Sequence, residues 1–518
     1  MNDESRRPAF TRVLVALLLC GALAILIDTV LGLKSFRDVA YPDSATLLRI
    51  GDVVRDGHVY PDSVNKPPYY LSLYGPLFYL VLAIPFRVAQ MFGADIVLVE
   101  RLTVLAFFCT SIVLVFFISR KISSSTRAAW FSVLFVLSPY VIGSWTTQIR
   151  SDFLGLTLVL SGFYCFLLLQ DRPYACVLSA IPSGLAPLSK QTFIALPIVI
   201  VSWLILRRRY KEAFCWGAAF ALVAGGGFAV IWMHDPFMRE HLAVLGHPLL
   251  EFRGAFRLAS DAVSQPMIPF AIVGALLLFW KRTSEELLLP FYWLAALLIG
   301  CATVPQVGGG LNYFWESLWI SAILAGPAVL ELERIAGQTA RPYRVLVYIL
   351  LVGWFAPLLH LELWDFQKDY QDVKAYQARK ADFQRFASFV KGHRFLSTYP
   401  DLTVLSTNPE LPDPGLNTIL EIGGHWSYRP VITQLDDRVF EFAVITPSLN
   451  ETFRGVHFWD AGMVQSLHAQ YRLACVFQDM DVWLPIEDTA RLLPRFEDIG
   501  CKPADSSPGS PHAIAAPQ

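Results

Sequence analysis

The chain has 518 residues, of which 54% are hydrophobic and only 16% are charged, and its formal net charge is −1. A soluble protein of this length would have about a quarter of its residues charged, so this composition excludes an ordinary soluble globular protein and indicates an integral membrane protein. The near-zero net charge also argues against nucleic acid as a partner.

The N-terminus is basic and leads into a long apolar run at residues 12–33. The apolar core of a signal peptide has only about 7–15 residues and is followed by a small-residue cleavage site, which this sequence does not clearly contain. We therefore expect an uncleaved signal anchor with the N-terminus in the cytoplasm.

Further apolar runs follow along the chain. Because a bilayer core requires about 20 apolar residues per helix, we predict a mainly α polytopic membrane protein of about eleven transmembrane helices. The expected spans are residues 12–33, 96–119, 128–146, 153–170, 174–189, 193–206, 212–233, 266–280, 286–304, 314–332 and 344–362.

The apolar segment 75–93 is ambiguous, because Pro85 interrupts it and Arg87 and Gln90 follow. If this segment does not cross the membrane, nearly every short basic loop falls on the cytoplasmic side together with the N-terminus, as the positive-inside rule requires. If it crossed, all later basic loops would lie outside. We therefore predict an interfacial or re-entrant helix here.

This topology places a long first loop, residues 34–95, outside the cytoplasm, together with the polar C-terminal part. In that part a helical pattern at 369–393 precedes short β-rich pieces, among them "RPVIT" (429–433) and "FEFAVIT" (440–446). Such alternation is typical of a small α/β domain. We expect a transmembrane catalytic domain over 1–362, an extracytoplasmic α/β domain over 363–500 and a disordered Pro/Ser/Ala-rich tail over 501–518.

The cysteines and histidines do not indicate a metal site by their spacing. Six of the eight cysteines lie in apolar runs and no C-x-x-C pair exists, whereas Cys475 and Cys501 lie in the polar C-terminal part. These two can form a disulfide if that part faces an oxidising compartment. The outer loops contain scattered histidines for which loop or snorkelling roles are expected: His58, His234, His241 and His247.

Two acids lie at the external mouths of predicted spans. Asp43 begins a short amphipathic pattern in "YPDSATLLRIGDVVRDG", and Asp152 follows Arg150 in "RSDFLG". Each acid is consistent with a helix N-cap, because Asp is a preferred capping residue. An ionisable group near membrane depth is also a functional candidate, so both interpretations stay open.

Two outer motifs contain bases. In "NKPPYYLSLYGPL", Lys66 precedes two prolines and a group of aromatics that includes Tyr74. This pattern is equally consistent with an aromatic belt in which the lysine anchors to lipid phosphate. Lys190 and Gln191 in "LSKQT" lie at the external end of a span, against the positive-inside trend.

A third outer motif, "QVGGGLNYFWE" at 306–316, combines three glycines with Asn312, Tyr313 and Glu316. A glycine run allows the backbone to approach a phosphate, but before a helix it is more often a turn. These residues are weaker candidates for a pocket.

The order and sidedness of four motifs resemble the GT-C superfamily of integral-membrane glycosyltransferases. These motifs are "YPD" at 41–43, "KPP" at 66–68, "RSD" at 150–152 and "LSKQT" at 188–192. The resemblance covers roughly residues 10–335 and is nearest to the bacterial branch of lipid A aminoarabinose transferases and protein O-mannosyltransferases. The family's first acid often belongs to an acidic pair, whereas Ser44 follows Asp43 here, so use of a divalent metal stays open.

The resemblance implies a hexosyl- or pentosyltransferase that moves a sugar from a polyprenyl-phosphate carrier to a lipid, glycan or protein acceptor, with inversion. The reaction would take place on the external face of a bacterial inner membrane. Asp43 and Asp152 would be catalytic, and Lys66, Arg150 and Lys190 would bind the carrier phosphate. The expected pocket and acceptor residues are Tyr74, Gln191, Asn312, Tyr313 and Glu316.

Three other classes remain as alternatives, and the charged outer mouths of the spans argue against one of them, a non-catalytic membrane scaffold. A transporter or flippase for polyprenyl-linked lipids would place charges within its spans, but here the spans have few central charges, with Asp28 as the main exception. An O-antigen ligase or polymerase would use arginines in a late outer loop, and the loop 234–265 contains Arg239, Arg253 and Arg257.

Overall fold

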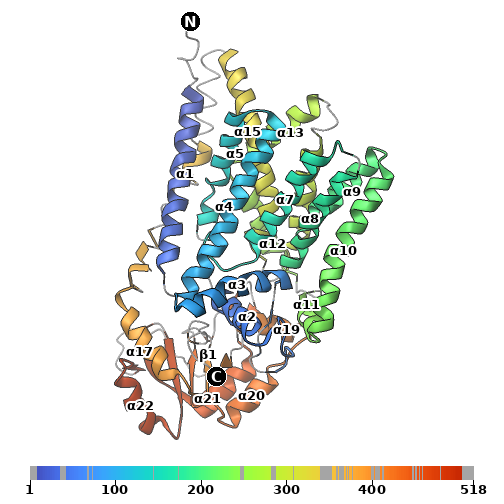
Figure 1. Ribbon diagram of the computed structural model, residues 1–518. Coiled ribbons are helices and arrows are strands. Elements are labelled where there is room, and N and C mark those ends of the chain that lie inside the picture. The colour runs from blue at the N-terminus through green and yellow to red at the C-terminus, as the bar shows by residue number, and fades with distance from the viewer. Residues whose placement is uncertain are drawn as a thin grey trace. The chain divides into compact units, whose positions relative to one another are not determined.

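The computed structural model describes most of the chain, and helices predominate (Figure 1). The described residues are 9–35, 42–66, 69, 71–72, 74–143, 145–172, 174–245, 250–281, 287–306, 309–338, 353–357, 360, 367–368, 370–371, 373–375, 377–397, 402, 409–410, 414–445, 449, 452–453, 456–457, 459–478 and 480–504.

The chain divides into two compact units. A helical unit comprises Met1–Ser35, Tyr74–Met233 and Glu251–Lys374, and an α/β unit comprises Phe36–Leu73, His234–Leu250 and Ala375–Gln518. Most of the segment predicted as the first outer loop, Phe36–Leu73, groups with the C-terminal residues from Ala375 on, and the predicted domain boundary at residue 362 stays a prediction.

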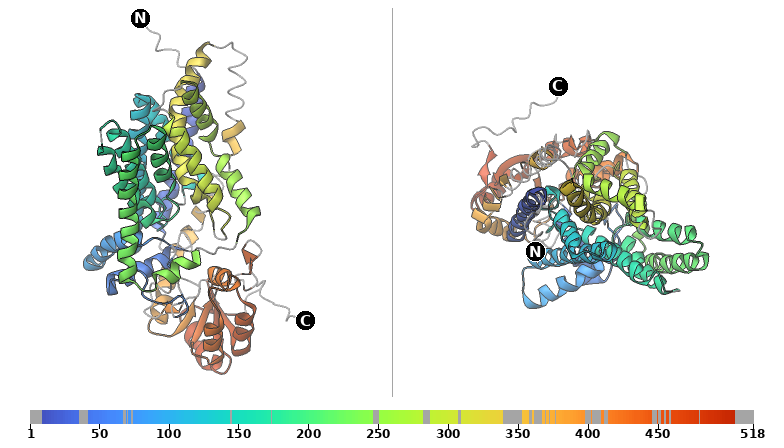
Figure 2. Two further views of the ribbon diagram at one scale, coloured as in Figure 1. Left: turned by 90° about the vertical axis from the view of Figure 1, so that its right-hand side faces the viewer. Right: turned by 90° about the horizontal axis from the view of Figure 1, so that it is seen from above.

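The helical unit consists of long and short apolar helices, most of which run roughly parallel, as Figure 1 and Figure 2 show. Its helices are α1 (Ala9–Lys34), α3 (Pro76–Phe92), α4 (Ile96–Ser123), α5 (Thr126–Val136), α6 (Tyr140–Gly143), α7 (Asp152–Leu169), η2 (Ala175–Ser179), α8 (Ala180–Ser189), α9 (Ala195–Leu206), α10 (Tyr210–His234), α12 (Phe252–Val263), α13 (Ile268–Lys281), α14 (Leu288–Thr303), η3 (Leu311–Phe314) and α15 (Trp315–Gln338).

Within the described residues, four helices are long and apolar enough to cross a membrane by themselves: Thr11–Lys34, Ile96–Ser123, Asp152–Leu169 and Tyr210–His234. A fifth candidate is the pair α12 and α13, which is bent by 71° between the two helices. Several other predicted spans are shorter apolar helices, and most of 344–362 lies outside the described residues. The protein is therefore an integral membrane protein, while the count of eleven spans stays a prediction.

The surface and packing of this unit are those of helices in lipid. α10 exposes large apolar side chains, and Met233 is 82% exposed. Between helices, small residues allow close approach. A Cβ at Gly326 of α15 would lie 2.2 Å from Ser132 Oγ of α5, so no larger residue fits there without displacing a helix.

Proline explains why some predicted spans are broken. The expected span 128–146 forms α5 and the short α6 instead, with Pro139 between them. Proline disfavours helical geometry in the residue before it and has no N–H to donate, so α5 ends before it.

α3 lies across the lower ends of α4 and α8 in Figure 1, unlike its roughly parallel neighbours. It has 17 residues, contains Pro85, and ends at Gly93, which adopts the left-handed conformation with φ 63°. This orientation is the one expected of an interfacial helix, and the topology of the segment stays a prediction.

The α/β unit contains a six-stranded mixed sheet with the strand order β2-β1-β3-β7-β6-β8 and a separate β4–β5 pair. β1 is parallel to β2 and β3, and the remaining pairs are antiparallel. Its strands are β1 (Phe395–Ser397), β2 (Pro409–Glu410), β3 (Phe442–Ile445), β4 (Thr452–Phe453), β5 (Val456–His457), β6 (Tyr471–Phe477), β7 (Met480–Pro485) and β8 (Lys502–Pro503). Its helices are α2 (Pro42–Asp56), α11 (Met238–Leu245), α17 (Lys380–Val390), α19 (Pro414–Ile422), α20 (Arg429–Asp436), α21 (Ala461–Gln470) and α22 (Thr489–Glu497).

One predicted strand in this unit is wrong. "RPVIT" begins α20, although Val431, Ile432 and Thr433 have high β propensity. Pro430 lies in the first helical turn, where its fixed φ is favourable, and Val431 and Leu435 are both buried at helical spacing. Burial of one helical face therefore overrides the local preference for a strand.

The first outer loop contributes to the core of the α/β unit. Val64, Tyr69 and Leu71 belong to one buried cluster with residues of α20, α21 and β7. The Trp426 indole N–H donates to the Val64 carbonyl over 2.9 Å. These contacts explain why residues 36–73 group with the C-terminal part of the chain.

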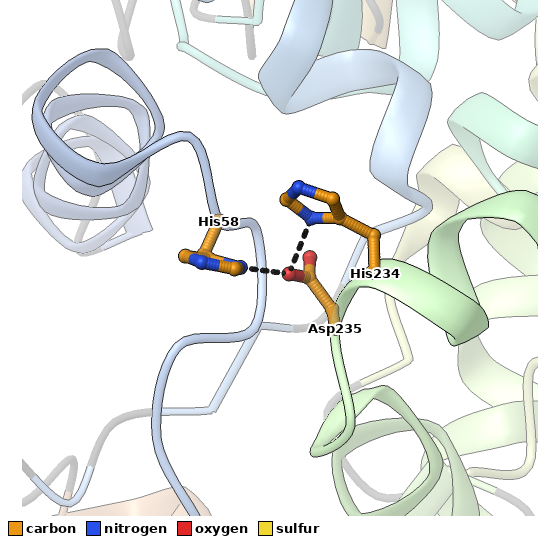
Figure 3. Close-up of side chains that lie close together, drawn as sticks. All are labelled: His58, His234 and Asp235. Carbon is orange, nitrogen blue, oxygen red and sulfur yellow. Dashed lines mark hydrogen bonds and ion pairs between the residues drawn. The ribbon is translucent and has the colours of Figure 1, made fainter.

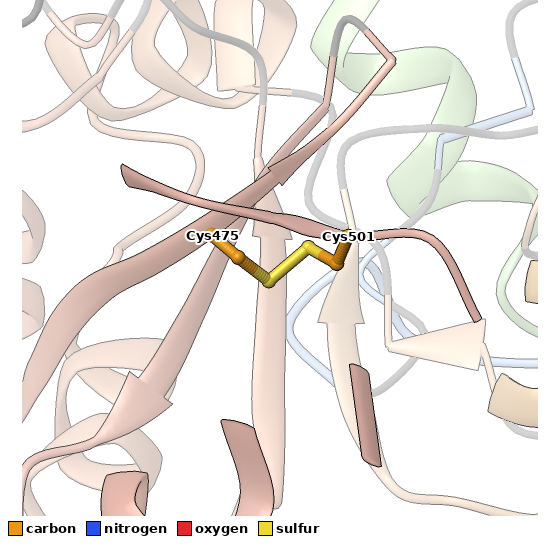
Figure 4. The surroundings of a disulfide bond; sticks show 2 residues. All are labelled: Cys475 and Cys501. Atoms are coloured by element: carbon orange, nitrogen blue, oxygen red, sulfur yellow. A yellow bond between two sulfur atoms is a disulfide. The ribbon is translucent and has the colours of Figure 1, made fainter. Parts of the chain in front are cut away.

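Cys475 of β6 and Cys501 form the disulfide that the sequence allowed, and Figure 4 shows their surroundings. β8, which follows Cys501 directly, pairs with β6. The expected disordered tail over 501–518 is therefore wrong for its first residues, because a disulfide and a strand pairing hold them. Residues 505–518 lie outside the described residues.

Candidate functional site

Asp152 is the centre of a buried polar cluster in the helical unit. α7 begins at Asp152, so its carboxylate lies in the first turn, where the helix dipole favours negative charge. The side chain is only 2% exposed. Its Oδ1 accepts hydrogen bonds from Lys190 Nζ over 2.5 Å and from Asn312 Nδ2 over 2.9 Å.

Lys190 completes an ion pair with this acid. It follows α8 in extended geometry, is 6% exposed, and its Nζ lies 4.8 Å from the centre of the Tyr313 ring. Burial lowers the pKa of Lys190 because it disfavours the charged ammonium, and the Asp152 carboxylate opposes this effect. The structure thus brings together four of the predicted site residues: Asp152, Lys190, Asn312 and Tyr313.

Several buried polar atoms around this ion pair lack a hydrogen-bond partner within the part of the chain that the structure describes. They are Gln148 Oε1, Arg150 Nε, Ser151 Oγ, Asp152 Oδ2 and Gln191 Nε2. Native proteins satisfy nearly all buried polar groups, so a group of such atoms indicates a bound polar ligand or water. Donors and acceptors are both present among these atoms.

Arg150 stands beside this group with its guanidinium 4.3 Å from the centre of the Trp145 ring. The Trp145 ring in turn packs 5.3 Å from that of Trp315. An arginine held over an aromatic ring is fixed in direction while its N–H groups remain available to an anion. Sequence reasoning predicted Arg150 but missed Gln148 and Ser151, which precede Asp152 without any distinguishing pattern.

The end of the first outer loop is attached directly next to Lys190. The Gly75 N–H donates to the Ser189 carbonyl over 3.0 Å. A Cβ at Gly75 would lie 2.1 Å from the Leu188 carbonyl oxygen, so only glycine fits this contact. Tyr74 is therefore one residue from a backbone contact with the "LSKQT" motif, and it packs edge-on against Phe78.

Glu316 is buried near the start of α15, but its described partners differ from those of Asp152. Its Oε1 accepts a hydrogen bond from the Tyr292 hydroxyl over 2.6 Å, and it also accepts one from the Leu196 backbone N–H. These contacts join α14, α15 and the start of α9. They give Glu316 a structural role between helices, and its predicted pocket role stays untested.

Asp43 lies in the α/β unit and is fully buried. α2 begins at Pro42, so Asp43 is inside the first turn and does not occupy the capping position. An acid whose only role was a favourable interaction with the helix dipole could have that role in an exposed position. The functional role of Asp43 stays a prediction.

Lys66 also lies in the α/β unit and is exposed. Its backbone N–H donates to the Ser63 carbonyl over 3.0 Å, and its carbonyl accepts from the Tyr69 N–H over 2.8 Å. These bonds form a turn that presents the side chain to solvent. The two prolines of the "KPP" motif, residues 67–68, lie outside the described residues.

The α/β unit contains a second polar cluster that the sequence did not predict. His58, His234 and Asp235 converge on one another, as Figure 3 shows. No local spacing could reveal this cluster, because 177 positions separate His58 from Asp235 along the chain.

The fold is similar to those of two solved glycosyltransferases. ArnT from Cupriavidus metallidurans, the lipid A aminoarabinose transferase, bound to undecaprenyl phosphate is 14% identical, and the match covers 91% of this chain and 98% of that chain with a TM-score of 0.57. The oligosaccharyltransferase AglB from Archaeoglobus fulgidus, in complex with an inhibitory peptide and a dolichol-phosphate, is 12% identical over 91% of this chain and 74% of that chain, with a TM-score of 0.51.

No protein-family model matches the sequence, and no curated protein matches it. Both solved structures are GT-C glycosyltransferases. At these identities the similarity establishes the fold alone. The GT-C resemblance predicted from the four sequence motifs is therefore confirmed at the level of the fold.

Proposed function

We propose that the protein is a glycosyltransferase that moves a sugar from a polyprenyl-phosphate carrier to an acceptor on the extracytoplasmic face of the membrane. The observation that carries this proposal is the set of buried, unsatisfied polar atoms beside the Asp152–Lys190 ion pair, in a chain with the GT-C fold. Such a site suits a ligand that is anionic and carries hydroxyls, and a phosphate-linked sugar is both.

The positive charges of the site suit a leaving group that is a phosphate. In the transfer, the acceptor oxygen forms a bond to the anomeric carbon while the bond from that carbon to the carrier phosphate breaks. The departing phosphate gains negative charge, which Lys190 and Arg150 stabilise, and Lys66 serves the same purpose from the first outer loop. Because Asp152 holds Lys190 and the Trp145 ring holds Arg150 before the reaction, these two cations require little reorganisation when the charge develops.

Asp43 and Asp152 have different roles in the transfer. The acceptor hydroxyl loses a proton as it attacks, and Asp43 is the carboxylate that takes it. A single displacement with this geometry inverts the anomeric centre. Asp152 positions the reactants, because Lys190 and Asn312 already occupy its Oδ1 while its Oδ2 remains available to a sugar or acceptor hydroxyl. Tyr74, Gln191 and Tyr313 line the pocket.

The lipid part of the carrier requires an apolar surface in the same helical unit. A cavity of about 330 Å³ lies among α12, α13, α14 and α15, lined mainly by apolar residues such as Ile268, Trp293 and Leu318. Its Ser317 directly follows Glu316. A few isoprene units of the carrier would bind here through apolar burial, which is not directional.

Two observations support the extracytoplasmic face of the membrane, which we infer to be a bacterial inner membrane. The short basic loops group on the side of the N-terminus, as expected for the cytoplasmic side. The Cys475–Cys501 disulfide requires an oxidising compartment to persist, and the cytoplasm is reducing. The sugar is a hexose or a pentose, and the acceptor is a lipid, a glycan or a protein.

The test is sugar transfer by the purified full-length protein in liposomes, with undecaprenyl-phosphate hexoses and pentoses as donors. We expect turnover by the wild type and at least a hundredfold loss in Asp43→Asn and in Lys190→Ala. Asp95→Asn is the matched control, because Asp95 is an exposed acid that caps α4, and it should retain full turnover.

Other outcomes would contradict the proposal. No turnover with any donor, together with movement of labelled lipid across the bilayer, would favour a flippase. Loss of activity on changing Arg253 or Arg257 but not Lys190 would favour an O-antigen ligase or polymerase. Equal activity in the wild type and Asp43→Asn would remove Asp43 from the mechanism.

A further inference from the structure

His58, His234 and Asp235 form a compact cluster in the α/β unit. The three candidate ligand atoms all lie within 4.8 Å of one another. His58 Nδ1 is 2.6 Å and His234 Nδ1 is 3.2 Å from the same oxygen, Asp235 Oδ1. The cluster thus directs two imidazole nitrogens at one carboxylate oxygen.

Backbone hydrogen bonds fix the carboxylate at the centre of this cluster. Asp235 is 1% exposed, and its Oδ2 accepts hydrogen bonds from the N–H groups of Val59 over 2.8 Å and Tyr60 over 3.2 Å. One oxygen is therefore occupied and orients the other toward the two histidines. A metal ligand is commonly held in this way by a second set of hydrogen bonds.

The two imidazoles would repel each other if both were charged. Their ring centres lie 4.6 Å apart with an angle of 33° between the planes. Two neutral imidazoles and one carboxylate that share a cation avoid this repulsion, and they are a common ligand set for Zn²⁺. A cation at the centre would replace the protons that otherwise link each histidine to Asp235.

The distances allow such a cation after small movements. Ligand atoms about 2.0–2.1 Å from a tetrahedral Zn²⁺ stand about 3.4 Å apart. The His234–Asp235 pair is close to this separation already, the His58–Asp235 pair has to open by about 0.8 Å, and the two imidazole nitrogens, which lie within 4.8 Å of each other, have to approach by up to about 1.4 Å. The His58 and His234 side chains are 39% and 57% exposed, so both can adjust and water can occupy the fourth position.

The cluster also lies at a junction between two segments of the α/β unit that other hydrogen bonds already join. Ser63 Oγ donates to Glu240 Oε2 over 2.6 Å. His241 accepts from the Ser72 N–H over 3.1 Å and donates to the Asp62 carbonyl over 2.9 Å. A metal ion bound by the cluster would add coordination bonds between the same two segments, and these bonds are stronger than the hydrogen bonds.

We propose that His58, His234 and Asp235 bind one divalent transition-metal ion of the Zn²⁺ class, with water as the fourth ligand. The ion links the first outer loop to residues 234–235 and so stabilises the α/β unit. This role is separate from the sugar transfer proposed above and does not depend on it. Two imidazoles favour Zn²⁺ over Mg²⁺ or Ca²⁺, which prefer oxygen ligands.

The test measures metal content in the full-length protein, purified through a tag that contains no histidine. The protein is exposed to Zn²⁺, dialysed, and analysed by elemental mass spectrometry. We expect about one Zn²⁺ per chain in the wild type and less than about 0.2 in the double variant His58→Ala/His234→Ala. His457→Ala is the matched control, because His457 is an exposed histidine of the same unit, and it should keep its metal.

A second readout does not depend on metal counting. Added Zn²⁺ should raise the midpoint of thermal unfolding of the wild type by about 5 °C and leave that of the double variant unchanged. Asp235→Asn retains an acceptor for the Val59 and Tyr60 N–H groups but loses the charged ligand, so it should fold and bind no metal. A wild type without bound Zn²⁺, or a double variant with a full equivalent, would overturn the proposal.

Discussion

At the scale of single residues, the most informative group is the buried ion pair of Asp152 and Lys190. Removing one partner of a buried pair leaves the other charge uncompensated, and this typically costs about 3–5 kcal/mol. Removing both partners is far less costly. Stability and activity therefore respond differently to the two kinds of change, which allows a structural role to be separated from a functional one.

Lys190→Met should lower the midpoint of thermal unfolding, because Asp152 stays buried without its partner. The double variant Asp152→Asn/Lys190→Met should recover most of that stability, since it buries no net charge. Sugar transfer should be lost in both. Thermal unfolding and turnover measured on the same preparations check this, and recovery of turnover in the double variant would show that the pair is only structural.

His241 provides a prediction about pH. Its Nδ1 accepts a hydrogen bond from the Ser72 N–H, so the imidazole must be neutral in the folded state. Burial, reinforced by the charge of Arg49, lowers the pKa of His241 to about 4, whereas the unfolded chain has the ordinary value near 6.5. Between these values the unfolded state binds more protons, so stability falls as the pH falls.

We expect the α/β unit to lose up to about 3 kcal/mol of stability between pH 6.5 and pH 4 through this histidine. Hydrogen exchange of peptides covering 59–72 and 238–245, measured across this pH range, checks the loss. His241→Gln can keep both hydrogen bonds without titrating and should have a flatter profile. An identical pH profile in this variant would assign the acid sensitivity to other groups.

At the scale of the elements, the start of α3 and the end of α8 depend on each other. The contact of Gly75 with Leu188 and Ser189 fixes the backbone directly before Lys190. The position of this cation is thus set by two elements whose sequences show no relation to each other. A substitution at the start of α3 should therefore alter the position of Lys190 at the end of α8.

Gly75→Ala should reduce sugar transfer at least tenfold, because a Cβ there would lie 2.1 Å from the Leu188 carbonyl oxygen and force the two elements apart. Gly93→Asn at the other end of α3 is the control. Gly93 has φ 63° with open space around it, and asparagine tolerates this left-handed conformation. Turnover of both variants at equal expression checks this, and an equal effect on both would contradict the specific role of Gly75.

At the scale of the whole molecule, the topology is the property on which the proposed function depends. The basic residues 207–211 between α9 and α10 should lie in the cytoplasm, and the disulfide-containing C-terminal part should lie outside. Alkaline phosphatase is active only outside the cytoplasm. A fusion after residue 504 should therefore be active and a fusion after residue 209 inactive, and the reverse pattern would place the chemistry in the cytoplasm.

Sequence reasoning predicted the membrane class, most helices of the helical unit and the GT-C resemblance, and it allowed the disulfide without deciding it. The membrane class and the helices depend on apolar length and loop charge, which can be read locally, and the GT-C resemblance depends on the order and sidedness of four short motifs. It failed at "RPVIT", where tertiary burial reversed the local preference. It also failed at residues 501–503, where pairing with distant β6 orders a segment of low-complexity composition.

The sequence by itself determined that this chain is a polytopic membrane protein with polar outer motifs, because insertion into lipid selects for continuous apolar runs that can be read locally. Only the tertiary structure decided which polar residues meet. Asp152 contacts Lys190 and Asn312 at separations of 38 and 160 positions, and His58 meets Asp235 at 177. Ion pairs and metal ligands act through space between single residues, so they leave no periodic pattern along the chain.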